Sequence, residues 1–177
     1  KSDGKPIIFK FIDYLKKFTN NIILKTISEL EAFLEEQAIT ISEDEPRSFV
    51  NWDEVNSINE PDISFGSHTV NHPILTNEQT NVIEDEICRS KQITEKKTGR
   101  DVLHFCYPNG NYNEEIRKVV SGSYKSACTT RAGFVSRGSD IYALNRIGIN
   151  QEMVSGWRGN FSKYVFTLSL FLESIKK

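Results

Sequence analysis

Strand-like and helix-like segments alternate along residues 62–130, and no other feature of the sequence restricts the fold as strongly. Ile63 and Phe65 alternate with polar neighbours, as in a half-buried strand. Residues 76–99 begin with polar residues that can cap a helix, carry an apolar stripe at helical spacing and end at a glycine. The pattern continues as strand, helix and strand over residues 101–108, 114–123 and 124–130. Because strands that alternate with helices form parallel sheets, we predict an α/β fold.

The N-terminal part of the chain also carries helical patterns. Residues 26–37, TISELEAFLEEQ, place a serine before a glutamate-rich turn and space their apolar residues as in an amphipathic helix. Residues 52–58 repeat apolar side chains every three positions, which predicts a short helix. The apolar run 7–12 fits either a strand or the first half of a helix that extends to Phe18, and residues 38–42, AITIS, fit a short strand.

Composition and charge narrow the classes of partner. The 177 residues carry a formal net charge of -2, which lacks the basic excess of a surface for nucleic acid or anionic membranes, so we expect a small or neutral partner. No stretch approaches the roughly 18 consecutive apolar residues of a membrane span, so no transmembrane segment is expected. No repeat, low-complexity tract or linker divides the chain, and we predict a single domain over residues 1–177.

The cysteines and the N-terminus leave the cellular compartment open. Cys88, Cys106 and Cys128 are odd in number and lack Cys-x-x-Cys spacing, so they indicate neither a disulfide framework nor a zinc knuckle. The chain begins KSDGKP, without methionine and without the apolar segment of a signal peptide, which is typical of a processing site or a segment boundary. A cytoplasmic location and a cell-envelope location both remain open.

Two of the three histidines lie four residues apart in the segment GSHTVNHP, residues 66–73. On a helix, residues at this spacing share one face with Cβ atoms about 5–6 Å apart, so His68 and His72 could both turn a ring nitrogen toward one metal ion. A catalytic zinc site takes three protein ligands and leaves one position for water, so the pair would need a further ligand, commonly a carboxylate. The same spacing also occurs by chance in exposed helix histidines, and spacing alone leaves both interpretations open.

A second polar segment, YPNG at residues 107–110, follows the next predicted strand. Pro, Asn and Gly favour a tight turn between a strand and a helix, which is a sufficient structural reason for their presence. However, both segments follow predicted parallel strands, and ligand chemistry gathers at the C-terminal ends of such strands. From these residues alone, a purely structural turn and a role in ligand binding both remain open.

Together, GSHTVNHP and FCYPNGNYNEE resemble the metal and groove motifs of the NodB-like polysaccharide deacetylases. The softer similarity of FVNWDEV and SACTTRAGFVSRGSDIYALNRIGI extends the resemblance over residues 48–149. In that family a His-Ser/Thr-x-x-His-Pro segment supplies two metal ligands. This implies that His68 and His72 bind a divalent ion such as zinc and that Thr69 helps to fix their loop. The resemblance further implies an α/β fold of the NodB type, a distorted and here incomplete (β/α) barrel.

The resemblance also assigns roles within the turn. It implies that Tyr107, Pro108 and Gly110 line the substrate groove and that the backbone N–H of Asn109 helps to stabilise the oxyanion of the reaction. Cys106 stands where many members of the family carry an arginine that orients the catalytic base, although a branch with the pattern aYPxG is similar to this sequence. The departure at Cys106 leaves the orientation of the base without an assigned residue.

The aspartate pair that supplies the base and the third metal ligand in this family has no clear counterpart. One alignment places KFIDY on the motif, which makes Asp13 the metal ligand and puts Ile12 where the base belongs. In the alternative, which we favour because residues 12–21 have a helical pattern, this region is an insertion and the aspartates precede Lys1 in a longer protein. The general-acid histidine of the family also lacks a counterpart, because no histidine follows His104.

The activity implied by the resemblance is metal-dependent hydrolysis of N-acetyl groups from amino sugars, with an N-acetylated glycan as partner. The implied enzyme class is a hydrolase of non-peptide carbon–nitrogen bonds, and an envelope role follows from the resemblance alone. One alternative is a glycan-binding or scaffold protein that keeps the fold but has lost the base. A third class is a structural domain without metal.

Four further residues are interpreted structurally. We expect Trp52 to anchor the core. We expect His104, which lies on a predicted strand and outside the matched motifs, to be a hydrogen-bonded structural residue. We expect Arg131 and Arg146 to carry surface or loop charges rather than catalytic roles.

Overall fold

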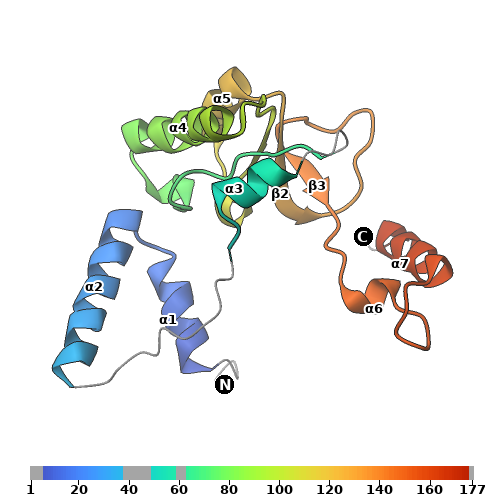
Figure 1. Cartoon of the computed structure of the whole chain (residues 1–177), viewed down its shortest axis with the longest axis horizontal. Helices are drawn as coiled ribbons and strands as arrows, with labels where there is room; N and C mark the ends of the chain where they lie inside the picture. The colour runs from blue at the N-terminus through green and yellow to red at the C-terminus, as the bar shows by residue number, and fades with distance from the viewer. Residues whose placement is uncertain (1–5, 38–48, 59–62, 176–177) are drawn as a thin grey trace.

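The computed structural model describes residues 6–37, 49–58 and 63–175, so the strand expected over residues 38–42 lies outside the described residues. Figure 1 shows an N-terminal helical hairpin, a central part that contains the sheet, and a C-terminal pair of helices. In chain order the elements are α1 (Ile7–Leu15), α2 (Asn20–Glu36), α3 (Trp52–Ser57), the 3-10 turn η1 (Leu75–Asn77), α4 (Thr80–Thr98), β1 (His104–Cys106), the 3-10 turn η2 (Pro108–Gly110), α5 (Glu114–Ser123), β2 (Ser126–Ala132), β3 (Leu144–Arg146), α6 (Gln151–Val154) and α7 (Lys163–Ile175).

The sheet consists of three parallel strands in the order β1-β2-β3. In the register of β1 and β2, His104 faces Ser126 and Cys106 faces Cys128. A further segment joins the edge of β1 at one residue. There the Ser67 N–H donates to the His104 carbonyl and the Cys106 N–H donates to the Ser67 carbonyl, both at 2.9 Å. The sheet confirms the predicted parallel α/β arrangement.

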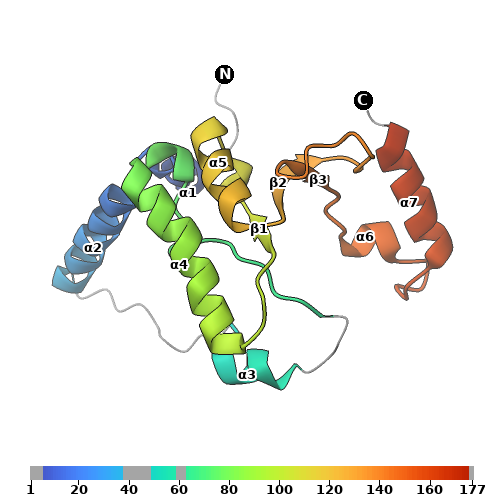
Figure 2. The ribbon, with the colours of Figure 1, turned by 90° about the horizontal axis from the view of Figure 1, so that it is seen from above.

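A core of buried apolar side chains joins the sheet to the helices α4 and α5. Figure 2 shows α5 beside one end of α4 and α3 beside the other. Full burial of a side chain such as Phe105 contributes about 1.5–3 kcal/mol, so this cluster is a major source of stability. Its members are Leu75, Ile83, Ile87, Val102, Phe105, Tyr107, Ile116, Val120, Tyr124 and Ala127.

The two helices on the sheet begin and end where local chemistry satisfies their backbone groups. α4 ends at Gly99, whose left-handed φ of 66° closes the helix as the sequence predicts. It begins at Thr80, later than the polar residues expected to cap it, because residues 75–77 form a separate 3-10 turn. α5 begins after Asn113, whose side-chain oxygen accepts a backbone N–H of the first turn.

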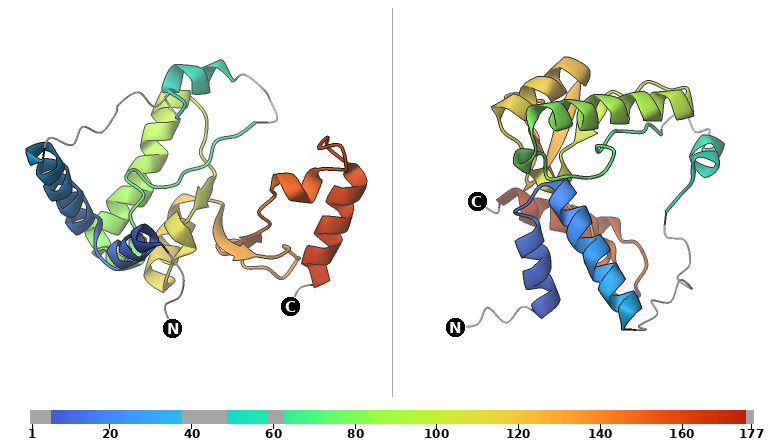
Figure 3. Two further views of the ribbon diagram at one scale, coloured as in Figure 1. Left: turned by 90° about the horizontal axis from the view of Figure 1, so that it is seen from below. Right: turned by 90° about the vertical axis from the view of Figure 1, so that its left-hand side faces the viewer.

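Residues 7–15 are helical, which decides between the two structures that fit the N-terminal apolar run. KFIDY therefore lies within α1, in agreement with the helical pattern that favoured the insertion alternative. α1 and α2 form a hairpin, and the far end of α2 projects away from the sheet in both views of Figure 3. Hydrogen bonds from Asn77 Nδ2 to the carbonyls of Lys16 (2.8 Å) and Phe18 (3.1 Å) tie this hairpin to the segment before α4.

Three local predictions have different outcomes. Residues 63–66 form no strand and only Ser67 pairs with β1, so the strand expected there was wrong over most of its length. Trp52 lies on the expected short helix, α3, but it is 38% exposed and is not the core anchor we predicted. The structural role of His104 is confirmed, because its Nδ1 lies 2.9 Å from the Ser126 hydroxyl on the adjacent strand.

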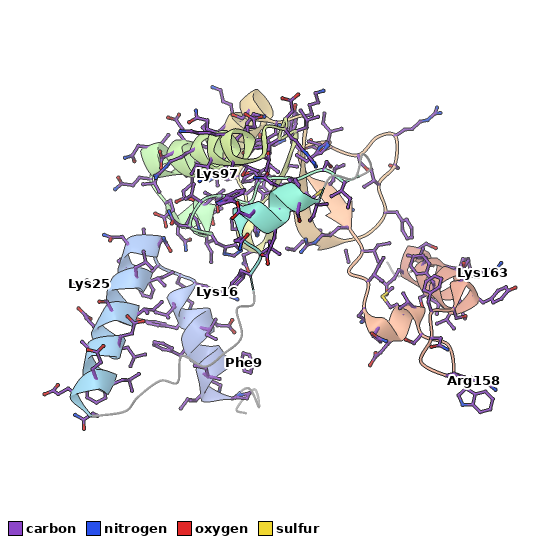
Figure 4. All side chains as sticks on the ribbon, in the orientation of Figure 1. Phe9, Lys16, Lys25, Lys97, Arg158 and Lys163 are labelled. Carbon is purple, nitrogen blue, oxygen red and sulfur yellow. The ribbon has the colours of Figure 1, made fainter. Side chains whose placement is uncertain are left out.

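Large apolar side chains remain exposed on α1, α2 and α7. Figure 4 shows side chains crowded around α4 and the sheet, whereas Phe9 on α1 stands away from that cluster. Phe9 is 54% exposed, and α7 similarly leaves Leu168 and Phe171 at the surface. None of the helices that the structure describes is long and apolar enough to cross a membrane.

The turn after β1 depends on a glycine. Gly110 has a φ of 78°, and a Cβ there would lie 2.8 Å from the Thr130 backbone nitrogen. We expect Gly110→Ala to lower the free energy of unfolding by about 2–4 kcal/mol, from backbone strain and overpacking together, as measured by chemical denaturation. Gly122→Ala is the matched control, because Gly122 lies in α5 with no atom within 4 Å of its Cβ position. Equal losses in the two variants would contradict the prediction.

Candidate functional site

A cleft of about 480 Å³ lies between the strands and the histidine loop, defined as residues 68–74. Both histidines of the loop, together with Tyr107 and Asn109, are among its lining residues, so four of the six predicted site residues meet there. Residues of β1, β2 and β3 form its other wall. The full lining is Gly66, Ser67, His68, His72, Cys106, Tyr107, Asn109, Cys128, Thr129, Thr130 and Arg146.

The histidine loop is not helical, so the expected helix face was wrong, yet the loop brings the two rings together. The ring centroids of His68 and His72 lie 4.7 Å apart at an interplanar angle of 74°. Thr69 and His72 have φ values of 67° and 54°, a left-handed conformation that costs a non-glycine residue on the order of 1–3 kcal/mol. These two left-handed residues, rather than a helical turn, place the histidines side by side.

Hydrogen bonds fix the orientation of His68 and the path of the loop. The Nδ1 of His68 lies 2.7 Å from the Cys106 carbonyl oxygen, and because a carbonyl only accepts, Nδ1 carries the proton. Nε2 of the neutral ring then keeps its lone pair, which is the form that binds a metal ion. The Thr69 hydroxyl accepts the His72 N–H (3.0 Å) and donates to the His68 carbonyl, which agrees with the loop-fixing role implied for Thr69.

A buried carboxylate that the sequence patterns did not reveal holds the loop in place. Glu86 of α4 is only 4% exposed, and its Oε2 accepts the N–H groups of Val70 (2.7 Å) and Asn71 (2.9 Å). Its Oε1 accepts from the Asn71 side-chain amide at 2.6 Å. The signal that could have found it is its position beside Ile83 and Ile87 on the apolar stripe of the helix, where a charged group requires partners.

The side chains of Tyr107 and Pro108 lie mostly in the core, and Tyr107 reaches the cleft with only a small part of its surface. The Tyr107 hydroxyl donates to the Tyr142 carbonyl (2.9 Å), and its ring stacks on Tyr112 with centroids 4.9 Å apart. Burial, the largest cause, raises the pKa of the Tyr107 phenol well above its usual range. The substrate-binding roles of Tyr107, Pro108 and Gly110 stay predictions.

Asn109 lies in the turn in a third left-handed conformation, with a φ of 55°. Its side-chain amide donates to Asn111 Oδ1 (2.6 Å), and its carbonyl accepts from the Thr130 hydroxyl (3.3 Å). Asparagine tolerates this conformation better than most residues, which fits its place in a tight turn. The structure places Asn109 at the cleft, and the oxyanion role of its N–H stays a prediction.

The strand wall of the cleft carries two thiols and one permanent charge. Cys106 and Cys128 line it from β1 and β2, and burial, followed by the neighbouring Cys128 thiol, raises the pKa of Cys106. Among the lining residues that the structure describes, Arg146 alone is permanently charged. Arg146 is exposed, as expected for a surface charge. The prediction did not include its position at the end of β3, where the sheet register brings it to the cleft.

The described residues contain no group of three or more His, Cys, Asp and Glu side chains arranged to hold a metal ion. His68 and His72 are therefore a pair of candidate ligands, and within the described ranges no carboxylate completes the set. Asp13 lies on α1, 3.9 Å from the Lys16 ammonium, and is not a third ligand in this structure.

Comparisons with known proteins identify the family. A sequence model of the family described as polysaccharide deacetylase matches residues 9–123, which is more than half of the chain. The chain belongs to the polysaccharide deacetylase family. It is 32% identical over 92 residues to YxkH of Bacillus subtilis (strain 168), a protein whose name assigns it provisionally to the polysaccharide deacetylases. That match covers 51% of this chain and 33% of YxkH.

Two solved structures are also similar to this member of the family. The Streptococcus pyogenes deacetylase PplD, in complex with acetate, is 30% identical with a TM-score of 0.56 over 59% of this chain and 46% of PplD. The polysaccharide deacetylase BC0361 of Bacillus cereus is 22% identical with a TM-score of 0.53 over 67% of this chain and 42% of BC0361, and it shows the fold alone. The chain thus spans between a third and a half of the length of these relatives.

These similarities confirm the predicted fold class. The three parallel strands with the helices packed on them are part of a NodB-type (β/α) barrel, which is incomplete in the described part of this chain. The cleft extends across the strands, from Ser67, which adds a single paired residue beside β1, to Arg146 of β3.

The role of Glu86 can be tested by removing its carboxylate. Glu86→Ala leaves three N–H donors of the histidine loop without their acceptor, so we expect a loss of about 3 kcal/mol in the free energy of unfolding. Hydrogen exchange should accelerate at the Val70 and Asn71 amides. Glu84→Ala, on the exposed side of the same helix, is the control and should change stability by less than about 0.5 kcal/mol. Unchanged exchange at both amides would refute this role.

The buried phenol of Tyr107 predicts a loss of stability in alkali. Its raised pKa means that the fold favours the neutral phenol, so its contribution is complete below the ordinary tyrosine value of about 10 and is lost as the pH rises beyond it. Tyr107→Phe should be less stable by about 1 kcal/mol at neutral pH, because it lacks the hydrogen bond to Tyr142. The difference in the free energy of unfolding between Tyr107→Phe and the native chain should decrease above pH ~10. Chemical denaturation of the variant and the native chain from neutral to alkaline pH measures this difference. A difference that does not change with pH would contradict the predicted role of the buried phenol.

Proposed function

We propose that this polysaccharide deacetylase family member forms part of a metal-dependent enzyme that removes N-acetyl groups from amino sugars of a glycan. The observation that carries the proposal is the histidine pair, whose rings lie 4.7 Å apart in the cleft with His68 in the tautomer that leaves Nε2 for a metal. Family membership supports a carbohydrate substrate. Because the chain covers less than half of each relative, the activity is proposed for the whole protein.

In this proposal, different residues of the chain have separate roles. His68 and His72 would hold the divalent cation, and zinc suits a pair of imidazole nitrogens. Such an ion supplies Lewis acidity for activating water and polarising a carbonyl. The Asn109 N–H is the candidate donor to the acetyl oxygen, where negative charge develops during attack. We assign the third ligand and the carboxylate base to residues outside the described part of the chain.

A second candidate function is glycan binding without catalysis. One observation favours it, because no carboxylate lines the cleft among the described residues. The resemblance of the turn to the family motif also implies that Cys106 replaces an arginine that orients the base. Such a protein would bind the same N-acetylated glycan and leave it unchanged. Release of acetate from an N-acetylated oligosaccharide by the metal-loaded, full-length protein would exclude this alternative.

Metal binding can be tested on this chain without an assay of activity. Zinc should raise its unfolding temperature, and zinc at 100 times Kd corresponds to about 2.7 kcal/mol of stabilisation. His68→Ala and His72→Ala should each lose this response, because each removes one of two ligands. His104→Ala is the matched control, because its ring bonds Ser126 outside the cleft, and it should keep the response. A native chain whose unfolding temperature zinc does not change, as in both cleft variants, would favour a purely structural domain. A zinc response that both cleft variants keep would place the zinc at other residues and contradict the proposed ligand pair.

A further inference from the structure

Two of the three cysteines are direct neighbours in the sheet, although they are 22 residues apart in the sequence. Cys106 of β1 and Cys128 of β2 are register partners in the parallel pair. Adjacent strands lie about 4.8 Å apart, which falls within the range of roughly 4.4–6.8 Å between the Cα atoms of a disulfide. The backbone therefore already holds these residues at a separation that a disulfide can span.

The two thiols also point to the same side of the sheet. Side chains alternate along a strand, and the preceding partners, Phe105 and Ala127, are both fully buried in the core beneath the helices. Cys106 and Cys128 consequently face the opposite side, where both line the cleft and both are partly exposed. The cleft, at about 480 Å³, gives a small molecule access to them.

We propose that Cys106 and Cys128 form a redox modification site that closes to a disulfide by exchange with a small-molecule disulfide such as oxidised glutathione. One thiol, as its thiolate, attacks the reagent and releases one molecule of reduced glutathione. The second cysteine then displaces the other glutathione from the mixed disulfide. In balance, two protein thiols lose two protons and two electrons, and one oxidised glutathione becomes two reduced molecules.

The proposed disulfide lies next to the candidate metal ligand His68. The Cys106 carbonyl accepts the Nδ1–H of His68 at 2.7 Å, so the bridge forms on the residue that orients one candidate metal ligand. Cys88, in contrast, lies on α4 with its sulfur 3.6 Å from the Ser123 hydroxyl and does not line the cleft. Cys88 therefore supplies an internal control within the same chain.

The test treats the reduced, folded chain with oxidised glutathione and maps its disulfides under non-reducing conditions. Trypsin places Cys106 in peptide 101–117 and Cys128 in peptide 126–131, with Cys88 in a third peptide. We expect the first two peptides to be linked, at a mass two hydrogens below their sum. Cys88→Ser should keep this link. Cys106→Ser and Cys128→Ser should each leave a glutathione adduct on the remaining partner.

The proposal is overturned if the native chain and Cys88→Ser, both shown to be folded by circular dichroism, give only free thiols or separate glutathione adducts at the two positions. A link that involves Cys88 in the native chain would also overturn it. Neither readout uses metal or substrate. Failure of the disulfide would therefore leave the proposed deacetylase function untouched, and failure of zinc binding would leave the thiol site untouched.

Discussion

The geometry of the cleft depends on one buried interaction, the contact between the Glu86 carboxylate and the histidine loop. A carboxylate loses its hydration when it is buried, and strong hydrogen bonds are needed to offset that loss. The loop supplies three N–H donors to Glu86, two from the backbone and one from the Asn71 side chain. In return, Glu86 stabilises a backbone in which Thr69 and His72 adopt unfavourable left-handed conformations.

Through this interaction, the shape of the cleft depends on packing in the core. Glu86 keeps its position because its neighbours Ile83 and Ile87 anchor α4 and are almost completely buried. The Cys106 carbonyl that orients His68 likewise follows Phe105, which is fully buried. The groups that hold the candidate ligands are thus themselves held by packing, as preorganised sites require.

The sequence predicted the framework of this site better than its details. Apolar periodicity located the long helix and its glycine stop, and the two polar segments were correctly expected to lie together. The shape of the histidine loop was not predictable, because left-handed backbone at Thr69 and His72 has no residue signature comparable to that of a glycine. Arg146 and the Cys106–Cys128 pairing depend on strand register between distant segments, which the pattern of a single sequence does not encode.

The left-handed residues around the cleft also bear on when the cleft can form during synthesis. Thr69 and His72 adopt a left-handed conformation that is unfavourable for their residue types, and Asn109 adopts one that asparagine tolerates better. The groups that hold both loops come later in the chain. Glu86 lies on a helix downstream of the histidines, and Thr130 lies on a strand downstream of Asn109. The histidines are therefore made before the groups that hold them, and the pair can acquire its geometry only after Glu86 of α4 and Cys106 of β1 have been made.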